Sequence, residues 1–135
     1  MHQLGVKLAG HLLVGDLILV TGPLGAGKTV FAQGVAAGLG ISGVTSPTFV
    51  IARVHKGNPP FNHVDAYRLL DSKNPNLALA ELELDIDNSV TLIEWGGAES
   101  AQLSENRLEL TIDRTDEVRK VNVKAVGQRW AGFSL

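Results

Sequence analysis

The sequence contains no cysteine among its 135 residues. This absence excludes disulfides and thiolate metal sites, and it fits a reducing compartment such as the cytoplasm. The chain also lacks an apolar run of the roughly 18 residues that a membrane span needs, and its N-terminus has no charged-then-apolar signal pattern. The net charge is only −2, so no broad basic face for tight nucleic-acid binding is implied. We therefore expect a cytoplasmic protein that makes no membrane contact.

The composition is that of a folded chain. Hydrophobic residues make up 44% of the sequence and charged residues 19%, a balance typical of globular rather than disordered proteins. The length suits one domain with its own core. We find no internal repeat and no low-complexity segment, so residues 1–135 are predicted to form a single domain.

The most informative stretch is Gly22–Thr29, which matches the phosphate-loop pattern G-x-x-x-x-G-K-S/T in full. Glycines free the backbone to turn successive N–H groups toward phosphate oxygens. Lys28 adds a mobile positive charge, and the Thr29 hydroxyl is a hard oxygen ligand for Mg²⁺. An apolar strand precedes the loop and a helical pattern follows it, which is the context that the motif requires. The predicted nucleotide contacts here are Gly22, Pro23, Leu24, Gly25, Ala26, Gly27, Lys28, Thr29 and Val30.

The second informative stretch is the apolar strand predicted at residues 90–94, which ends in an acidic residue. Glu94 ends that strand and is followed by Trp95 and two glycines. A carboxylate at a strand end beside a phosphate loop is the layout that holds Mg²⁺, directly or through water. A strand that merely ends in a polar residue is the alternative. Trp95 either belongs to the core or flanks the nucleotide.

A second acid, Asp65, is predicted at the C-terminal end of the second strand of an antiparallel hairpin, formed by residues 49–55 and 61–65. Ligand sites lie at this end of open α/β sheets, and alternation puts His63 on the same face as Asp65. Asp65 therefore either serves the Mg²⁺ and water chemistry or caps a helix. Residues 45–48 form either an ordinary turn or a switch-like loop whose hydroxyls approach the γ-phosphate.

The remaining patterns complete an α/β fold. They predict an N-terminal helix within residues 1–14 and a short helix at 77–84. They also predict an antiparallel hairpin of strands 107–113 and 121–125 around a turn at 114–117. The tail at 127–135 is either loose or docked through Trp130 and Phe133. We expect a three-layer, P-loop NTPase-like domain with a mixed parallel and antiparallel sheet.

Four motifs, in this order and spacing, resemble the TsaE family, also called YjeE. They are the phosphate loop, Thr45–Phe49, His63–Arg68 and Ile93–Trp95, and the resemblance covers roughly Leu4 to Ala125. It implies a small bacterial ATPase that binds ATP and Mg²⁺ and hydrolyses ATP on the TsaB–TsaD assembly. That assembly adds the threonylcarbamoyl group to the adenosine next to the anticodon of tRNAs that read codons beginning with A. The tRNA would be met only through the complex, and we expect the chain alone to be a monomer.

The resemblance also implies residue roles. Lys28 and the loop amides would hold phosphate, and Thr29 and Glu94 would hold Mg²⁺. Asp65 would assist the attacking water, so Asp65 and Lys28 are the catalytic candidates, and Thr48 and Trp95 complete the predicted nucleotide contacts. Two features depart from the family pattern: the N-terminal part that helps to hold adenosine is short, and Gly96 stands where proline is frequent.

Two other functions fit the same motifs. A small-molecule kinase would use ATP as phosphate donor, but no lid or acceptor-binding insertion is evident. A nucleotide-gated binding module would bind ATP with negligible turnover. A GTPase is disfavoured because the sequence has no N-K-x-D motif for reading guanine.

Overall fold

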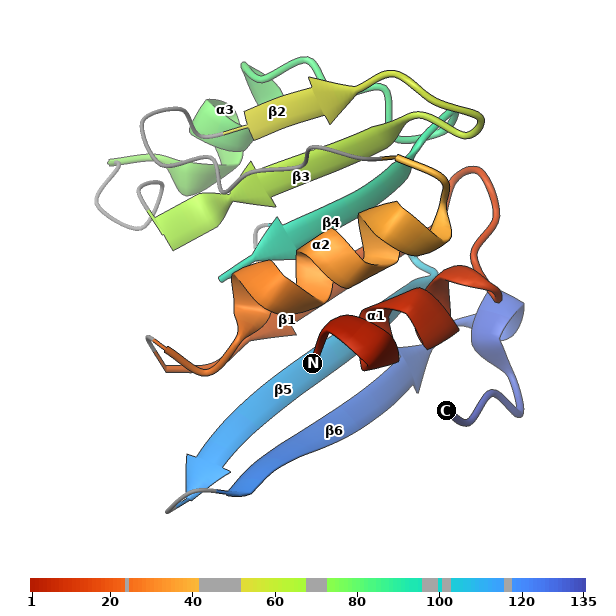
Figure 1. Cartoon of the computed structure of the whole chain (residues 1–135). Helices are drawn as coiled ribbons and strands as arrows, with labels where there is room; N and C mark the ends of the chain where they lie inside the picture. The colour runs from red at the N-terminus through yellow and green to blue at the C-terminus, as the bar shows by residue number, and fades with distance from the viewer. Residues whose placement is uncertain (24, 42–51, 68–72, 96–99, 101–102, 116–117) are drawn as a thin grey trace.

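The computed structural model describes residues 1–23, 25–41, 52–67, 73–95, 100, 103–115 and 118–135. These residues form a six-stranded sheet in the order β2-β3-β4-β1-β5-β6 (Figure 1). Its strands are β1 (Leu17–Thr21), β2 (Ala52–His55), β3 (Phe61–Asp65), β4 (Val90–Glu94), β5 (Arg107–Thr115) and β6 (Val118–Val126). The helices are α1 (His2–Ala9), α2 (Lys28–Gly38) and α3 (Pro75–Ala80), with a 3₁₀ turn at Gln128–Trp130.

The sheet is mixed, as predicted. Strands β3, β4, β1 and β5 run parallel, whereas β2 and β6 pair antiparallel to their neighbours. The four parallel strands therefore end at one edge of the sheet, and the arrowheads of β3, β4 and β5 point to the left, toward this edge, in Figure 1. Ligand sites in open α/β sheets lie at this edge.

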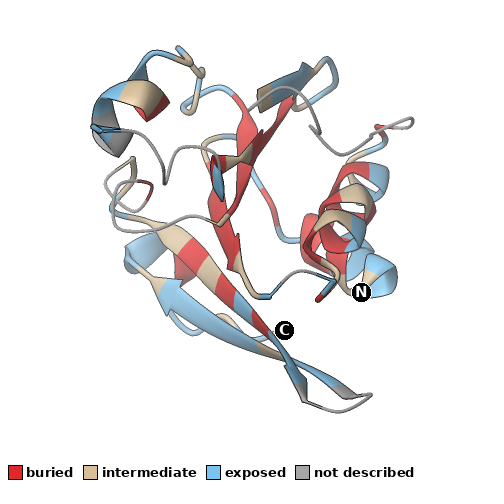
Figure 2. Cartoon of the chain, turned by 90° about the vertical axis from the view of Figure 1, so that its left-hand side faces the viewer, coloured by how far each residue is buried: buried red, intermediate tan, exposed pale blue. Residues whose placement is uncertain are grey.

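Helices cover both faces of the sheet, which gives the predicted three layers. Helices α1 and α2 pack on one face, where Leu8, Phe31 and Val35 are fully buried against the strands. The other face is covered by α3, whose Leu79 packs with Leu17 and other apolar side chains of β1, β3 and β4. Figure 2 shows the buried residues concentrated in the central strands and on the inward side of the helices beside the N-terminus.

The N-terminal helix is shorter than the predicted 1–14. It ends at Ala9 because the N–H groups of the next three residues bond to carbonyls three residues back rather than four, which tightens the turn. Leu8 and Leu12 are buried, but Val6 and Leu13 are 40% and 63% exposed. Beyond the turn, Leu13 no longer follows the helical spacing, so its side chain leaves the face that carries Leu8.

The helix predicted at 77–84 occupies Pro75–Ala80 instead. It begins earlier because the Asn74 side chain accepts a hydrogen bond from the Leu77 N–H and Pro75 fits the first helical position. It ends earlier because Glu83 has a φ of +52°, which a right-handed helix cannot include. None of the helices in the described part of the chain is long and apolar enough to cross a membrane.

The hairpin of β5 and β6 is longer than predicted, and residues 114 and 115 belong to a strand rather than to a turn. The register pairs Asp113 with Lys120 and Arg114 with Arg119. Opposite charges at the first of these pairs help the ladder to continue. Residues 114 and 115 of the predicted turn are thus the end of a paired strand, and residues 116 and 117 lie outside the described residues.

The C-terminal tail docks, so of the two alternatives from the sequence the loose one is wrong. Trp130 is 2% exposed, and its ring lies 5.0 Å from that of Phe133. The Arg129 guanidinium lies 4.0 Å above the Trp130 ring and donates two hydrogen bonds, of 3.0 and 3.1 Å, to the Asp16 carboxylate. This bidentate ion pair fastens the tail to the start of β1.

Candidate functional site

The phosphate loop joins the end of β1 to the start of α2. Gly25 and Gly27 take φ values of +77° and +105°, which residues with a side chain rarely adopt. Helix α2 begins at Lys28, directly after Gly27. Its unpaired N-terminal N–H groups and positive dipole end therefore face the loop, an arrangement that suits an anion.

A cavity of about 390 Å³ opens at this point. It is lined by Gly25, Gly27, Lys28, Thr29, Val30, Asp65, Glu94, Trp95 and Arg119. Eight of these nine residues were predicted from the sequence as site residues, and Arg119 was not. The fold thus brings residues that are up to 94 positions apart in the sequence, Gly25 and Arg119, to one cavity.

Backbone carbonyls of the loop hold the Lys28 side chain at the base of the loop. Its Nζ donates to the carbonyls of Gly22 and Pro23, both at 2.8 Å, and lies 4.1 Å from the centre of the Trp95 ring. Burial lowers the pKa of the Lys28 ammonium, while the nearby Glu94 and Asp65 carboxylates raise it in part. The loop thus positions a partly desolvated cation that an incoming phosphate would stabilise.

Thr29 and Glu94 meet beside Lys28. The Thr29 hydroxyl donates to Glu94 Oε1 over 3.2 Å, and Glu94 is only 4% exposed. A hydroxyl and a carboxylate are hard oxygen donors of the kind that Mg²⁺ prefers. Within the described residues, no group of three His, Cys, Asp or Glu side chains could hold a metal ion. A pair of one hydroxyl and one carboxylate suits a cation that completes its coordination with phosphate oxygens and water, as Mg²⁺ does.

His63 holds the other oxygen of Glu94. Its Nε2 forms a hydrogen bond with Glu94 Oε2, and the ring is fully buried. The ring also stacks on Phe61, with centroids 6.1 Å apart. His63 therefore fixes the direction in which the Glu94 carboxylate presents its oxygens. Alternation along the strand placed His63 on the Asp65 face but could not identify Glu94 as its partner.

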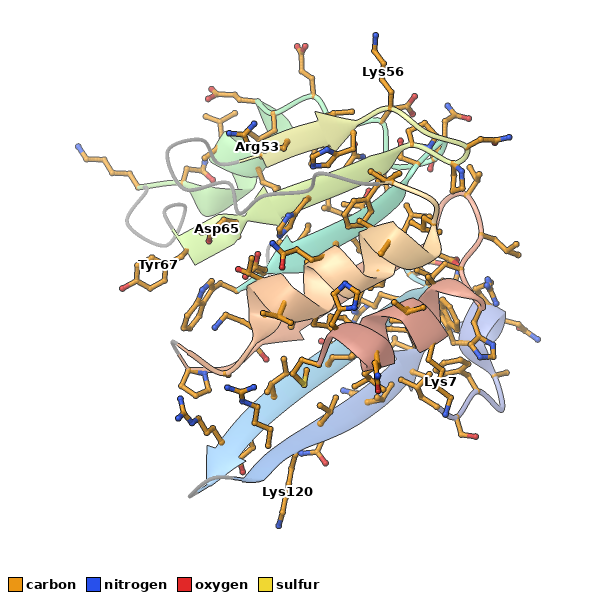
Figure 3. The ribbon with its side chains drawn as sticks, viewed as in Figure 1. Lys7, Arg53, Lys56, Asp65, Tyr67 and Lys120 are labelled. Atoms are coloured by element: carbon orange, nitrogen blue, oxygen red, sulfur yellow. The ribbon has the colours of Figure 1, made fainter. Side chains whose placement is uncertain are left out.

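Asp65 lies beside Glu94 at the end of the neighbouring strand, because the register of β3 and β4 pairs these two residues. Its Oδ1 accepts a hydrogen bond of 3.0 Å from the Tyr67 N–H, and its side chain also lines the cavity. Figure 3 shows Asp65 and Tyr67 together at this end of β3. The hydrogen bond to the Tyr67 N–H fits the predicted capping role of Asp65, and its place in the cavity lining fits the predicted role in site chemistry. The Tyr67 ring lies 5.1 Å from that of Trp95.

The other predicted site residues have different places. Gly22 and Pro23 lend carbonyls to Lys28 rather than lining the cavity, and Ala26 is fully buried. Leu24 and Thr48 lie outside the described residues, as do the rest of the predicted switch-like loop and the first part of the strand at 49–55. Their assignment to nucleotide contact stays a prediction.

Comparison with known proteins identifies the family of this chain. The family model described as threonylcarbamoyl adenosine biosynthesis protein TsaE matches residues 1–121. The chain belongs to the TsaE family. The resemblance found in the sequence motifs is thereby confirmed. A curated TsaE protein of Streptomyces coelicolor is 48% identical over 97% of this chain and 94% of its own length.

Curated TsaE proteins of lower identity also match most of the chain. The Mycobacterium tuberculosis protein is 41% identical over 82% of this chain and 71% of its own length, and the Bacillus subtilis protein is 40% identical over 86% and 73%. Each is named as a tRNA threonylcarbamoyladenosine biosynthesis protein. The crystal structure of Bacillus subtilis YdiB superposes with a TM-score of 0.74 and 34% identity over 96% of this chain and 82% of that one. The TsaE fold therefore extends over almost the whole chain.

Proposed function

We propose that this chain binds ATP with Mg²⁺ in the phosphate-loop cavity and hydrolyses the ATP to support a TsaB–TsaD complex. That complex would place the threonylcarbamoyl group on the adenosine next to the anticodon of tRNAs that read codons beginning with A. One observation carries the proposal: Lys28, the Thr29–Glu94 pair and Asp65 line a single cavity at the carboxyl ends of the parallel strands. Family membership supports the connection to tRNA modification.

Each residue has a task in ATP hydrolysis. The loop N–H groups and Lys28 bind the phosphate chain and offset its negative charge. Thr29 and Glu94 would hold Mg²⁺, which neutralises charge on the phosphates when bound. Because Glu94 is fixed by His63 on one side and Thr29 on the other, its oxygens are oriented before the nucleotide arrives.

Asp65 is the residue best placed to act on water. Asp65 lines the same cavity as the loop, and its carboxylate can orient a water molecule or accept its proton as the water oxygen attacks the γ-phosphorus. The bond from the γ-phosphorus to the bridging oxygen breaks, and ADP and inorganic phosphate leave. The Trp95 ring above Lys28 would shield this chemistry from bulk water.

The proposal includes the setting in which the chain works. We place it in the cytoplasm, as a monomer that acts on the TsaB–TsaD complex and meets tRNA only through that complex. The net charge of −2 supports this indirect route, because direct tRNA binding would need a basic surface.

ADP release from the purified chain, measured with and without TsaB–TsaD from the same organism, tests the proposal. We expect slow release alone and faster release with the complex. Release that depends on a small-molecule acceptor and not on TsaB–TsaD would indicate a kinase. Tight ATP binding with no release in either condition would indicate a nucleotide-gated binding module.

Replacing the loop cation should weaken nucleotide binding. Lys28→Ala removes the ammonium that the Gly22 and Pro23 carbonyls hold in the cavity. A hydrogen bond to a charged group contributes roughly 1.5–3 kcal/mol, so we expect ATP affinity to fall at least about tenfold. Titration calorimetry measures this, with Lys56→Ala as control because Lys56 lies in the β2–β3 turn, far from Asp65 (Figure 3). Equal affinities for wild type and Lys28→Ala would remove the assignment of the phosphate loop.

Removing the partner of Glu94 should raise the requirement for Mg²⁺. His63→Leu keeps an apolar side chain next to Phe61 but deletes the hydrogen bond to Glu94. Loss of such an outer-shell partner typically costs 10–100-fold in metal affinity. We expect the Mg²⁺ concentration for half-maximal ATP hydrolysis to rise by about that factor.

The matched control is His55→Leu. His55 stacks on the Phe61 ring as His63 does, with centroids 6.2 Å apart. It lies on the edge strand β2, opposite Phe61 of β3, so β3 separates it from β4 and Glu94. Burial lowers the pKa of His55 below its usual range, which favours the neutral ring. An unchanged Mg²⁺ requirement in His63→Leu would make His63 a packing residue only.

A further inference from the structure

In the β5–β6 hairpin, β5 extends past the end of β1, the parallel strand beside it. The register of β1 and β5 reaches Thr21 and Thr111, where β1 ends, whereas β5 continues to Thr115. Because the two strands are parallel, residues 112–115 run on beside the segment that follows β1, and that segment is the phosphate loop. Figure 1 shows the end of β5 at the same end of the sheet as this loop.

Two arginines of this extension reach the loop. Arg114 and Arg119 face each other across the two strands, and each donates to the Gly25 carbonyl over 3.4 Å. Two like charges directly opposite each other in an antiparallel pair repel, so this placement costs stability. An anion bound beside them would offset that cost. Of the two, Arg119 lines the cavity.

Arg119 and Lys28 approach the cavity from different elements. Lys28 comes from α2 and is fixed against the base of the loop, whereas Arg119 comes from β6 and lies outside the loop at Gly25. A planar guanidinium offers parallel N–H donors that match two phosphate oxygens at once, which an ammonium does not. The phosphate chain of a nucleotide in the cavity would then have a cation on each side.

We infer that Arg119 is a further binding residue of the site, and that it donates to phosphate oxygens of the bound nucleotide while Arg114 supports it from the opposite strand. The inference rests on the proposed nucleotide function. It adds a contact from the C-terminal hairpin to a site otherwise built by β1, α2, β3 and β4. Arg119 would release the Gly25 carbonyl, or share its donors with it, when phosphate enters.

The hairpin supplies its own control. Lys120 is the next residue along β6, carries the same charge and is paired with Asp113 on the opposite face. Figure 3 shows Lys120 pointing away from the rest of the molecule. Lys120→Ala therefore changes the net charge of the hairpin as Arg119→Ala does, without removing a group from the cavity.

The test compares the affinities of AMP, ADP and ATP for wild type, Arg119→Ala, Arg119→Lys and Lys120→Ala by titration calorimetry in Mg²⁺. For Arg119→Ala we expect a loss of at least about tenfold for ATP, a smaller loss for ADP and the smallest for AMP. Arg119→Lys should recover part of the ATP affinity because it keeps the charge but not the planar donors. Lys120→Ala should match wild type within about twofold, the scale of an exposed charge.

The pattern across the three nucleotides decides the outcome. An equal loss for AMP, ADP and ATP would overturn a contact with the β- and γ-phosphates, and no loss for any of them would overturn a phosphate contact altogether. If Arg119→Ala does not fold, Arg119→Lys carries the same comparison, and affinities equal to wild type for all three nucleotides would overturn the inference. Wild type that binds none of them would instead remove the proposed function itself, so the two failures are distinguishable.

Discussion

Asp65→Asn should bind ATP within a few-fold of the wild type and hydrolyse it at least about a hundredfold more slowly, the lower end of general acid–base contributions. The reason is that a carboxylate acting on water contributes mainly in the transition state, so turnover falls more than ground-state affinity. The asparagine side chain retains an oxygen that can accept the Tyr67 N–H. The local turn should therefore survive, and the TsaB–TsaD complex should form and then stall.

Three measurements separate the roles of Asp65. ATP titration gives the affinity, single-turnover hydrolysis with TsaB–TsaD gives the chemical step, and thermal unfolding reports the fold. Asp87→Asn is the matched control, since Asp87 is exposed on the turn before β4. Loss of affinity together with loss of folding would make Asp65 a structural cap. Normal hydrolysis would move the role to another residue, and Glu94 is the next candidate.

The part of the site that follows from local sequence was predictable. Strand β1, the phosphate loop and α2 are contiguous, so a motif of eight residues and its two flanks fix their order and the place of Lys28. The meeting of Glu94 with Thr29 also followed, because the parallel strands β1 and β4 end at the same edge of the sheet.

The contacts that depend on register were not predictable. Whether His63 reaches Glu94 depends on the alignment of β3 with β4, and a shift of one residue would turn the histidine to the other face. The sequence did not identify Arg119 for a related reason. The charged residues that precede it predict a turn at 114–117, and only the register of β5 with β6 shows that the hairpin continues beside the loop. Helix ends were also misplaced, because caps at Gly10 and Asn74 outweigh apolar spacing.

Glu94→Gln should raise the Mg²⁺ concentration for half-maximal hydrolysis at least about a hundredfold, since even outer-shell changes cost 10–100-fold in metal affinity. In the wild type both carboxylate oxygens are engaged, one by the Thr29 hydroxyl and one by His63 Nε2. The amide of glutamine has one acceptor oxygen and one donor nitrogen. It therefore loses the charge that attracts a hard cation and cannot accept from both partners, although it nearly preserves the shape.

The measurement is ATP hydrolysis against Mg²⁺ at fixed ATP, with thermal unfolding to show that the fold persists. Glu83→Gln is the control because Glu83 is exposed after α3. The double variant of Glu94→Gln with His63→Leu adds a sharper condition: if His63 acts only by orienting Glu94, the double variant should need no more Mg²⁺ than Glu94→Gln alone. Additive losses would show that His63 also works by another route. Normal activity of Glu94→Gln with an unchanged Mg²⁺ requirement would make Glu94 a buried structural acid. Thr29 would then lack the second Mg²⁺ ligand that β4 is proposed to supply.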